Sequence, residues 1–460
     1  MPMRIEQIDG TTPLEAFLAL RHLPFPFILS GGVTPSLRRY SYVGAAPSLR
    51  IETRSGHTET ILSSRRVTFP TPFHALSTIM EEHTNGQESP FPFSGGFVGY
   101  LSYDLKSFIE SIPYRAPDCG AADCFLGLYD PIFIYDHSEL KGYVVSSGSE
   151  NTTLNAADLK GILSSPPLKG TLSTTDFHSD RGFTSNMTRQ GYLSRLKRVK
   201  GYIASGDIYQ VNLSQRLSLE WSGDPFSLYS RLISITPAPF SSFMDFGPYQ
   251  IISNSPERFL KVSGRQIETC PIKGTKARGK TDEEDRRIQE SLRRDKKELA
   301  EHIMIIDLER NDLGKICETG SVTVEDAMRI ETLPYLHHMV STVKGRLRDE
   351  VTLSECLRAC FPGGSITGAP KVRAMEIIDE VEPTPRGVYT GAIGYIDLSG
   401  NMDMAMAIRT AITTENRLQI NVGGGIVADS IPEREYDETI LKADSFLHLL
   451  TGDSVYRKEA

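Results

Sequence analysis

Apolar and polar positions alternate over short runs through the first 150 residues, which predicts strands separated by turns. Phe73–His83 has helical spacing instead and predicts a helix. Ile132–Tyr135 and Gly142–Ser146 are close enough in sequence to form a hairpin. The other strands expected in this part are Phe27–Ser30, Arg39–Gly44 and Arg50–Thr53, and a glycine-aromatic run at Ser94–Asp104 suits a closely packed strand or bend. No repeat period indicates a solenoid.

The pattern becomes more helical after residue 186. Apolar residues recur at helical spacing after Thr188, and Gly206 follows them, so a helix is expected between these two residues. Asp207–Arg216 then has the pattern of a strand. Two further strands, Gln250–Ser253 and Phe259–Val262, flank the segment N-S-P-E-R.

A charged stretch, Thr281–Lys297, leads into a helix that becomes apolar over His302–Leu308. Glu301 stands at the start of the apolar part, and apolar residues follow it on its own side at i+3, i+4 and i+7. Burying this carboxylate unpaired is costly, so it requires a proton, a cation or a metal. A salt bridge to an arginine would meet the requirement equally well.

The last helix carries a second group of charges. Ser430 and Glu433 match a capping box, which predicts that the helix begins there. Glu435, Glu438 and Lys442 fall on the face opposite its apolar stripe. Such a cluster is usually a solvated face with paired charges.

Glycine-rich segments make a functional interpretation of this cluster possible. Asn421–Ala428, N-V-G-G-G-I-V-A, ends just before the last helix, where exposed backbone N–H groups would bind an anion. Carboxylates and an anion site together suggest a carboxylate ligand bridged by a metal, and oxygen donors favour Mg²⁺ over zinc. A second glycine-rich turn, Gly363–Lys371, lacks the spacing of a P-loop, but its amides and the hydroxyls of Ser365 and Thr367 suit a carboxylate.

Composition limits the class of protein without identifying it. The 460 residues are 39% hydrophobic and 23% charged, which is ordinary for a globular chain with a sizeable core. The net charge of −8 and the lack of a basic block give no reason to expect nucleic acid. We expect no signal peptide, no spanning helix and no disulfide framework among six cysteines, so a reducing cytosol is the expected compartment.

The same composition suggests a division of the chain. Residues 148–186 are rich in Ser, Thr, Gly, Asn and Pro, which is typical of a linker. We therefore expect an N-terminal region over residues 1–150, a linker over 151–185 and a second region over 186–455.

The stretch Cys270–Gly279, C-P-I-K-G-T-K-A-R-G, contains the most informative lysine. Lys273 stands between an isoleucine and Gly274, where we expect the chain to turn. Held near apolar surface, its pKa would fall and leave an amine nucleophile. Local sequence alone favours the simpler interpretation, a lysine at a strand end that reaches water.

Longer motifs then point to one family. They are S-G-G-F-V-G-Y-L-S-Y-D at 94–104, G-D-I-Y-Q-V-N-L-S-Q-R at 206–216, S-P-E-R-F at 255–259, P-I-K-G-T at 271–275, D-L-E-R-N-D-L-G at 307–314, H-H-M-V-S-T-V at 337–343, F-P-G-G-S-I-T-G-A-P-K at 361–371, G-G-G-I-V-A-D-S at 423–430 and E-Y-D-E-T at 435–439. With these motifs the chain resembles the chorismate-utilising enzymes, in particular the large subunits of aminodeoxychorismate synthase and anthranilate synthase. The resemblance implies an α/β fold of the α+β type, with two packed antiparallel sheets surrounded by helices.

The resemblance also implies roles for individual residues. Glu301 and Glu438 would bind Mg²⁺, with Glu435 close by, and the metal would receive the ring carboxylate of chorismate. Ser365, Thr367 and the amide of Gly368 fall where the family handles that end of the substrate. The enolpyruvyl carboxylate would be held by Tyr389, Arg409, Gly424 and Gly425, within reach of Lys442. His338 would lie near the leaving hydroxyl.

Within the family, two positions distinguish the reactions. Isochorismate and salicylate synthases carry a lysine base where this chain has Gln210, and anthranilate synthases typically read P-I-A-G-T where this chain has Lys273. The resemblance therefore implies amination of chorismate at C4, on the route to 4-aminobenzoate and folate. The hypothesis is that Lys273 attacks C2 while Glu257 protonates the departing hydroxide, and that ammonia then displaces the lysine.

Ammonia would come from a separate glutamine amidotransferase, because no G-x-C-x-G nucleophile motif occurs in the chain. Two alternatives stay open: the large subunit of anthranilate synthase, and a non-catalytic relative that binds tryptophan or chorismate. The segment that would contact tryptophan, residues 26–32, lacks the acidic residue found in some relatives, so tryptophan binding is not predicted either way.

Overall fold

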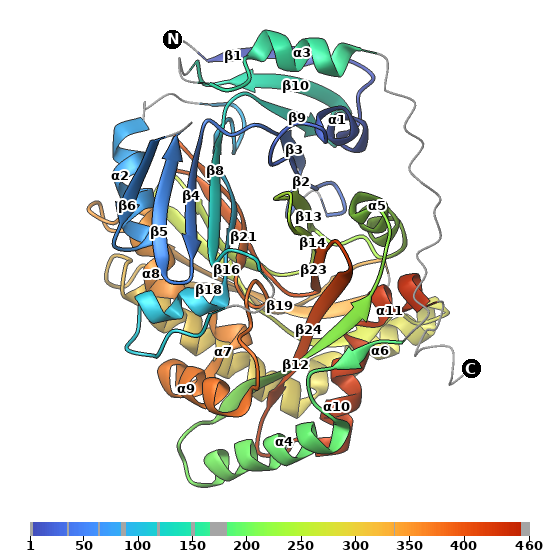
Figure 1. Ribbon diagram of the computed structural model, residues 1–460. Coiled ribbons are helices and arrows are strands. Elements are labelled where there is room, and N and C mark those ends of the chain that lie inside the picture. Colours follow the sequence, from blue (N-terminus) through green and yellow to red (C-terminus); the bar gives the residue numbers. More distant parts are fainter. Residues whose placement is uncertain are drawn as a thin grey trace.

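The computed structural model describes residues 3–34, 36–62, 65–83, 89–116, 120–148, 152–165, 182–334 and 336–451. Within these ranges two twelve-stranded sheets form, and all their strand pairs are antiparallel. This confirms the predicted fold class. Figure 1 shows the two sheets side by side with helices around them.

One sheet, here called sheet A, includes the N-terminal strand. In spatial order its strands are β1 (Arg4–Ile8), β10 (Lys141–Ser146), β9 (Ile132–Asp136), β3 (Tyr40–Gly44), β2 (Phe27–Leu29), β13 (Phe240–Asp245), β14 (Gln250–Ser255), β23 (Thr410–Thr414), β24 (Arg417–Ile426), β12 (Gln210–Glu220) and β11 (Thr184–Ser185), with β20 (Gly368–Ala369) also paired to β12.

The other sheet, sheet B, includes the predicted lysine strand. Its strands in spatial order are β17 (Ile272–Ala277), β19 (Leu336–Arg346), β16 (Gln266–Cys270), β15 (Arg258–Ser263), β22 (Met402–Met406), β21 (Ala392–Asp397), β7 (Gly96–Leu101), β8 (Cys124–Tyr129), β4 (Leu49–Arg54), β5 (His57–Leu62) and β6 (Arg65–Phe69), with β18 (Thr323–Thr332) also paired to β19.

The helical segments lie around the sheets. They are α1 (Pro13–Leu20), α2 (Pro72–His83), η1 (Tyr103–Phe108), α3 (Ala156–Ser164), α4 (Arg189–Ala204), α5 (Pro225–Ile235), α6 (Asp282–Arg294), α7 (Lys296–Gly314), α8 (Leu353–Cys360), η2 (Gly364–Ile366), α9 (Lys371–Val381), α10 (Pro432–Leu441) and α11 (Asp444–Thr451), where η marks a 3₁₀ turn. None of the described helices is long and apolar enough to cross a membrane.

The cores explain the layers. Between the sheets, Phe27 and Tyr42 of sheet A pack with Tyr100, Phe125 and other residues of sheet B. This inter-sheet core also contains a hydrogen bond of 2.8 Å between the hydroxyls of Tyr100 and Tyr249, which lets two large aromatic side chains be buried without an unpaired hydroxyl. On the outer faces, α2 and α8 cover sheet B, and α1, α5 and α11 cover sheet A. Burial of apolar surface on both faces of each sheet is the main force that holds these layers together.

The two predicted regions share both sheets. Strands from the first 150 residues form one part of each sheet, and they join the later strands where β2 pairs with β13 in sheet A and where β7 pairs with β21 in sheet B. The division by sequence therefore does not correspond to separate cores in the described part of the chain. In the predicted linker, α3 begins at the Asn155 cap and buries Leu159 and Leu163; residues 166–181 lie outside the described residues.

Several predicted helix boundaries are wrong. The charged stretch is two helices, because the Asp295 side chain accepts the backbone N–H groups of Lys297 and Glu298 and begins α7. Ser430 is not a helix cap, since its hydroxyl accepts the N–H of Val427, and α10 begins after Ile431 without a side-chain cap. The C-terminal helix is also interrupted, and α11 starts at Asp444.

Candidate active site

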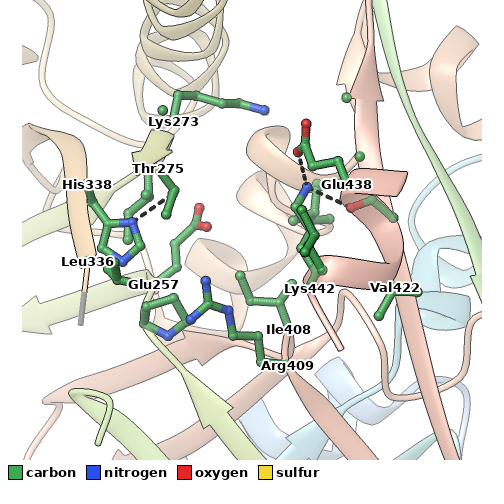
Figure 2. A pocket seen from close by; sticks show the side chains of 18 of the residues that line it. Glu257, Lys273, Thr275, Leu336, His338, Ile408, Arg409, Val422, Glu438 and Lys442 are labelled. Carbon is green, nitrogen blue, oxygen red and sulfur yellow. Dashed lines mark hydrogen bonds and ion pairs between the residues drawn. The ribbon is translucent and has the colours of Figure 1, made fainter. Parts of the chain in front are cut away.

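A cavity of about 710 Å³ lies where the two sheets meet helices α7 and α10. Strand β17 and strand β19 of sheet B line one side, and the glycine-rich end of β24 from sheet A lines the other. In Figure 2, Lys273, Glu257 and His338 lie on the first side, and Glu438 and Lys442 face them from the second. Basic and acidic groups thus face each other across a space that suits a small anionic molecule.

Lys273 reaches this cavity from an irregular strand. The predicted turn at Gly274 is wrong: β17 continues through it, with a register shift between Lys273 and Thr275 along β19. Gly274 has φ of +63°, and a Cβ there would come within 2.8 Å of Leu292 Cδ1. A glycine therefore permits the bulge, and bulges of this kind redirect neighbouring side chains. Lys273, Gly274 and Thr275 all line the cavity as a result.

The environment of Lys273 favours a neutral amine. Burial lowers its pKa, and the positive charge of Lys442 lowers it further, although Glu301 and Glu257 act in the opposite direction. Its Nζ donates to the carbonyl oxygen of Ser365 at 3.3 Å. The amine is half-buried rather than solvated, so the simpler interpretation of a lysine that reaches bulk water does not describe it.

Glu257 lies just before β15 and is 5% exposed. Burial raises its pKa to about 7, against the opposing effects of the Ser365 hydroxyl and the Lys273 ammonium. Ser365 Oγ donates to Glu257 Oε1 at 2.5 Å. Ser365 therefore touches both groups, with its hydroxyl on the acid and its carbonyl on the amine. A carboxyl group with this pKa can give up a proton near neutral pH.

His338 lies beside these groups on β19. Its Nδ1 is 2.9 Å from Thr275 Oγ1, and its Nε2 has no hydrogen-bond partner among the described residues. Burial, and then the charge of Arg409, lower the pKa of the imidazole to about 3. His338 is therefore neutral at physiological pH and can offer only a neutral ring nitrogen to a bound molecule.

The opposite wall combines carboxylates with lysines. Glu435, which is 5% exposed, pairs with Lys297 at 3.2 Å, and Lys297 is also 3.9 Å from Glu301. Glu438 pairs with Lys442 at 2.9 Å, and this lysine holds the pKa of Glu438 below its usual value. Burial raises the pKa of Glu301. In the part of the chain that the structure describes, no three ligating side chains already form a closed metal site.

Glycines make room next to this wall. A Cβ on Gly424 would lie 3.6 Å from Lys442 Nζ, 3.8 Å from Glu435 Oε2 and 4.0 Å from Glu438 Oε1. A Cβ on Gly425 would lie 2.2 Å from Gln210 Nε2 and 3.6 Å from Lys273 Nζ. Side chains at these two positions would therefore occupy the space between the charged groups, which explains the glycines that interrupt β24.

Tyr389 and Arg409 complete the lining. Tyr389 is 6% exposed, and Arg409 adopts φ of +49°, an uncommon value for a residue other than glycine. The guanidinium of Arg409 points toward Glu257 and His338 in Figure 2. A backbone conformation that costs of order 1 kcal/mol or more is typical of a functional position.

The sequence profile of the chorismate binding enzyme family matches residues 27–448, which include every group described above. The chain belongs to this family.

Individual chorismate binding enzymes agree with that assignment. The chain is 40% identical over 440 residues to an aminodeoxychorismate synthase component 1 from Salmonella typhimurium, covering 94% of this chain and 95% of that protein. It is 37% identical over 461 residues to an anthranilate synthase component 1 from Acetivibrio thermocellus, covering 95% and 92%. The crystal structure of anthranilate synthase component I from Streptococcus pneumoniae matches with a TM-score of 0.80 at 35% identity, covering 89% and 92%.

The fold brings most of the predicted residues to the cavity. All the predicted site residues except Thr367 and Gly368 line it. Those that line it are Lys273, Glu257, His338, Ser365, Tyr389, Arg409, Gly424, Gly425, Lys442, Glu301, Glu435 and Glu438. Thr367 and Gly368 lie behind the lining: the Thr367 hydroxyl donates to the Gly363 carbonyl at 3.0 Å, and Gly368 pairs with Val211 of β12. Their contact with substrate stays a prediction.

Sequence reasoning missed three charged groups of the site, Lys297, Glu298 and Asp444. Lys297 and Glu298 line the cavity from the first turn of α7, and Lys297 pairs with Glu435 from a distant part of the chain. The i, i+4 spacing of Lys297 and Glu301 was the available signal. No signal in the sequence indicated the pairing of Lys297 with Glu435, because this pairing depends on how α7 and α10 meet.

Proposed function

We propose that this chain aminates chorismate at C4, with Mg²⁺ and ammonia, to give 4-amino-4-deoxychorismate. The observation that carries the proposal is Lys273, a half-buried amine with a lowered pKa that faces the cavity beside Glu257. The amine donates to the Ser365 carbonyl at 3.3 Å and forms no ion pair within 4.0 Å among the described residues. A desolvated amine next to a carboxyl group that can donate a proton is the arrangement that covalent catalysis requires.

The first step makes the covalent adduct. The lone pair of the Lys273 amine forms a bond to C2 of the ring, both ring double bonds shift, and the C4–O bond breaks. The proton of Glu257 goes to the departing hydroxide, which leaves as water. The resulting secondary ammonium then returns a proton to the Glu257 carboxylate.

The second step reverses the shift. Ammonia forms a bond to C4, the double bonds return, and the C2–N bond to Lys273 breaks. Glu257 protonates the departing lysine amine, and the ammonium formed at C4 loses a proton. The enolpyruvyl group is not touched in either step. Two allylic displacements with a good nucleophile replace one direct displacement of hydroxide by ammonia.

Substrate orientation follows from the charges around the cavity. Arg409 can hold the enolpyruvyl carboxylate in a bidentate pair, with the backbone amides of Gly424 and Gly425 and the Tyr389 hydroxyl nearby. Ser365, and behind it Thr367 and Gly368, form the end of the site that receives the ring carboxylate. His338 is neutral, and its Nε2 has no hydrogen-bond partner in the part of the chain that the structure describes, so it suits a hydrogen bond to the C4 hydroxyl.

The residues present fit Mg²⁺. Three carboxylates, Glu301, Glu435 and Glu438, face the same cavity, and the missing side chain at Gly424 leaves space within 4.0 Å of two of them. Oxygen donors of this kind suit a hard divalent cation. When bound, the cation would neutralise the ring carboxylate and help to draw electron density from the ring. Lys297 and Lys442, which now pair with these carboxylates, would exchange partners on binding.

A glutamine amidotransferase partner would supply ammonia. The relatives named above are the first components of two-component synthases, and this chain lacks a nucleophile motif for glutamine hydrolysis. We therefore assign the chain the synthase half of the reaction.

Anthranilate synthesis is the second candidate. Anthranilate synthase components are as similar to this chain as aminodeoxychorismate synthase components are, at 37% and 40% identity. That reaction places the nitrogen on C2 and needs open space where Lys273 extends. A chorismate-binding or tryptophan-binding protein without activity is a further alternative. The acid Glu257 and the amine Lys273, which lie together in the cavity, argue against it.

Product analysis tests the proposal. With chorismate, Mg²⁺ and ammonium, the wild-type chain should form a product that yields 4-aminobenzoate only after addition of a lyase. Lys273→Ala should lose this product by at least about 10³-fold, the size of effect expected when a nucleophile is removed, and could form fluorescent anthranilate instead. Lys273→Arg, which keeps the charge, is the matched control and should be equally inactive. Anthranilate as the wild-type product would overturn the proposal.

A further inference from the structure

Behind the acid and the amine, Glu309 of α7 holds the turn that joins them. The Glu309 side chain is 2% exposed, and its Oε1 accepts the backbone N–H of Gly364 at 3.0 Å. Gly364 begins the η2 turn. A Cβ on Gly364 would lie 2.6 Å from Leu308 Cδ2 and 3.0 Å from Glu309 Oε1, so the glycine allows the close approach of helix and turn.

The next residue along the turn is Ser365. Its hydroxyl donates to Glu257 at 2.5 Å, and its carbonyl oxygen accepts from Lys273 at 3.3 Å. A single peptide unit therefore separates the group that Glu309 holds from the two groups that Ser365 holds. A displacement of the Gly364 N–H would be transmitted directly to both contacts.

The surroundings of Glu309 distinguish it from an ordinary buried ion pair. Its Oε2 has no hydrogen-bond partner among the described residues. The cation that acts on Glu309, Lys371, pairs with Asp312 and donates to the carbonyls of Cys360 and Pro362 at 2.9 and 2.8 Å. Lys371 therefore fixes the chain before the turn, and Glu309 fixes the turn itself.

We propose that Glu309 is a positioning residue: by accepting the Gly364 N–H it fixes the peptide that presents Ser365 to Glu257 and Lys273. Glu309→Asp withdraws the carboxylate by one methylene group and should loosen that peptide. Glu309→Gln keeps an oxygen that accepts the same N–H and should preserve it.

The most direct readout is the protonation of Glu257. The Ser365 hydroxyl lowers the pKa of Glu257, so a loosened turn should raise it. In Glu309→Asp we expect a rise of about half a unit, measured by ¹³C NMR of glutamate-labelled protein, with the Glu257 signal assigned by its loss in Glu257→Gln. The charged and titratable groups that face Glu309 are Asp312 on α7, Lys371 on α9, Cys360 on α8 and Glu257 itself, and none of them is altered.

Turnover supplies a second readout, and only this one rests on the proposed function. In Glu309→Asp, kcat for chorismate consumption with Mg²⁺ and ammonium should fall about tenfold, as expected for a small misplacement of reacting groups. KM should change less than kcat, because no substrate contact is removed. Glu309→Gln should stay within about twofold of the wild type in both parameters.

The matched control is Asp397→Glu. Asp397 is also a buried carboxylate that accepts backbone N–H groups, from Ser94 and Ser399, but it lies outside the cavity lining. It should leave the pKa of Glu257 and kcat unchanged. If Glu309→Asp does not fold, Glu309→Met, which fills the same space without an acceptor, is compared with the equally uncharged Glu309→Gln, and the same rise in the pKa of Glu257 relative to Glu309→Gln is expected.

Three results would overturn the inference: an unchanged pKa of Glu257 in folded Glu309→Asp, equal impairment of Glu309→Gln and Glu309→Asp, or the same shift in Asp397→Glu. Because the NMR measurement needs no turnover, a protein that does not aminate chorismate at all would refute the proposed function and leave this test intact.

Discussion

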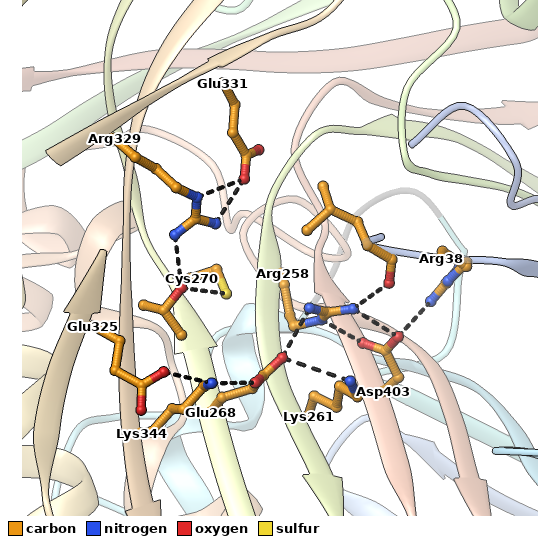
Figure 3. A network of polar contacts seen from close by, with 12 residues as sticks. Arg38, Arg258, Lys261, Glu268, Cys270, Glu325, Arg329, Glu331, Lys344 and Asp403 are labelled. Carbon is orange, nitrogen blue, oxygen red and sulfur yellow. Dashed lines mark hydrogen bonds and ion pairs between the residues drawn. The ribbon is translucent and has the colours of Figure 1, made fainter. Parts of the chain in front are cut away.

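Two neighbouring residues, Glu257 and Arg258, belong to buried polar networks of opposite character. Glu257 faces the cavity, and burial raises the pKa of its carboxyl group to about 7. Arg258 points to the other side, where it donates to Asp403 at 3.0 Å, to Glu268 at 3.0 Å and to the Leu37 carbonyl at 2.6 Å (Figure 3). The Glu257 carboxylate accepts a hydrogen bond from Ser365, whereas the Arg258 guanidinium is paired with two carboxylates and a carbonyl.

The Arg258 network stabilises the charged form of Asp403. Burial would raise the pKa of Asp403, but Arg258 and Arg38 hold it below its usual value. Glu268 extends the network toward Lys261 and Lys344, at 3.7 and 4.0 Å (Figure 3). Such paired and hydrogen-bonded charges are costly to break, since removing one partner leaves the other buried and unpaired.

The difference shows which buried charges are available for chemistry. In the Arg258 network the pKa of Arg258 is raised and the pKa of Asp403 is lowered, so both side chains stay charged near neutral pH. In the cavity, Glu257 and Lys273 are both shifted toward their neutral forms. Buried groups whose pKa values are shifted toward the neutral form are typical of a functional site, whereas matched charges are typical of a structural one. The following predictions test this contrast.

The largest expected effect is on turnover. Glu257→Gln removes the proton donor, and kcat for chorismate consumption should fall by about 10² to 10⁴-fold, measured with Mg²⁺ and ammonium. Folding should be unimpaired. An amination rate within about threefold of the wild type would show that Glu257 is not the acid.

Replacing Arg258, the adjacent residue, should lower stability and leave turnover nearly unchanged. Arg258→Met leaves Asp403 buried without its main partner and should lower the free energy of unfolding by about 3–5 kcal/mol, measured by denaturant titration. Because Arg258 does not line the cavity, kcat per folded molecule should change little. A large loss of kcat without a loss of stability would contradict the contrast.

Glu257 and Asp403 should make the free energy of unfolding depend on pH in opposite ways. The pKa of Glu257 rises from 4.5 to about 7 on folding, so its proton stabilises the folded state at low pH, and this contribution is lost as pH rises through 7. Glu257→Gln should therefore become more stable than the wild type by up to about 3 kcal/mol at pH 8. Asp403, whose pKa is lowered on folding, contributes stability that is lost only under acidic conditions. A constant difference between Glu257→Gln and the wild type from pH 5 to 8 would contradict the assigned pKa.

The smallest expected effect is on the Mg²⁺ requirement, and it comes from Glu435. Glu435→Gln keeps the shape of a proposed Mg²⁺ ligand and should raise the Mg²⁺ concentration for half-maximal activity by about tenfold. Glu325→Gln, which removes an exposed partner of Lys344, is the control and should leave it unchanged. Equal Mg²⁺ requirements in both variants would remove Glu435 from the proposed ligands.

Sequence reasoning identified the cavity groups better than it identified their setting. The motifs around Lys273, Glu301 and Glu438 led to residues that do face one cavity. The bulge at Gly274 and the pairing of Lys297 with Glu435 were missed, because each depends on contacts between distant segments. The helix break at Asp295 was also missed, although its cause is the local cap that Asp295 forms with Lys297 and Glu298. The Arg258 network was missed because its partners come from three separate parts of the chain, at Leu37 and Arg38, at Glu268 and at Asp403.

Intact-mass analysis of the protein with chorismate and Mg²⁺, in the absence of ammonia, detects the covalent adduct itself. We expect an added mass equal to chorismate less one water, located on Lys273 by peptide mapping, absent from Lys273→Ala and lost when ammonium is added. Formation of 4-amino-4-deoxychorismate by Lys273→Ala at the wild-type rate, with no adduct on the wild-type chain, would contradict the covalent role of Lys273.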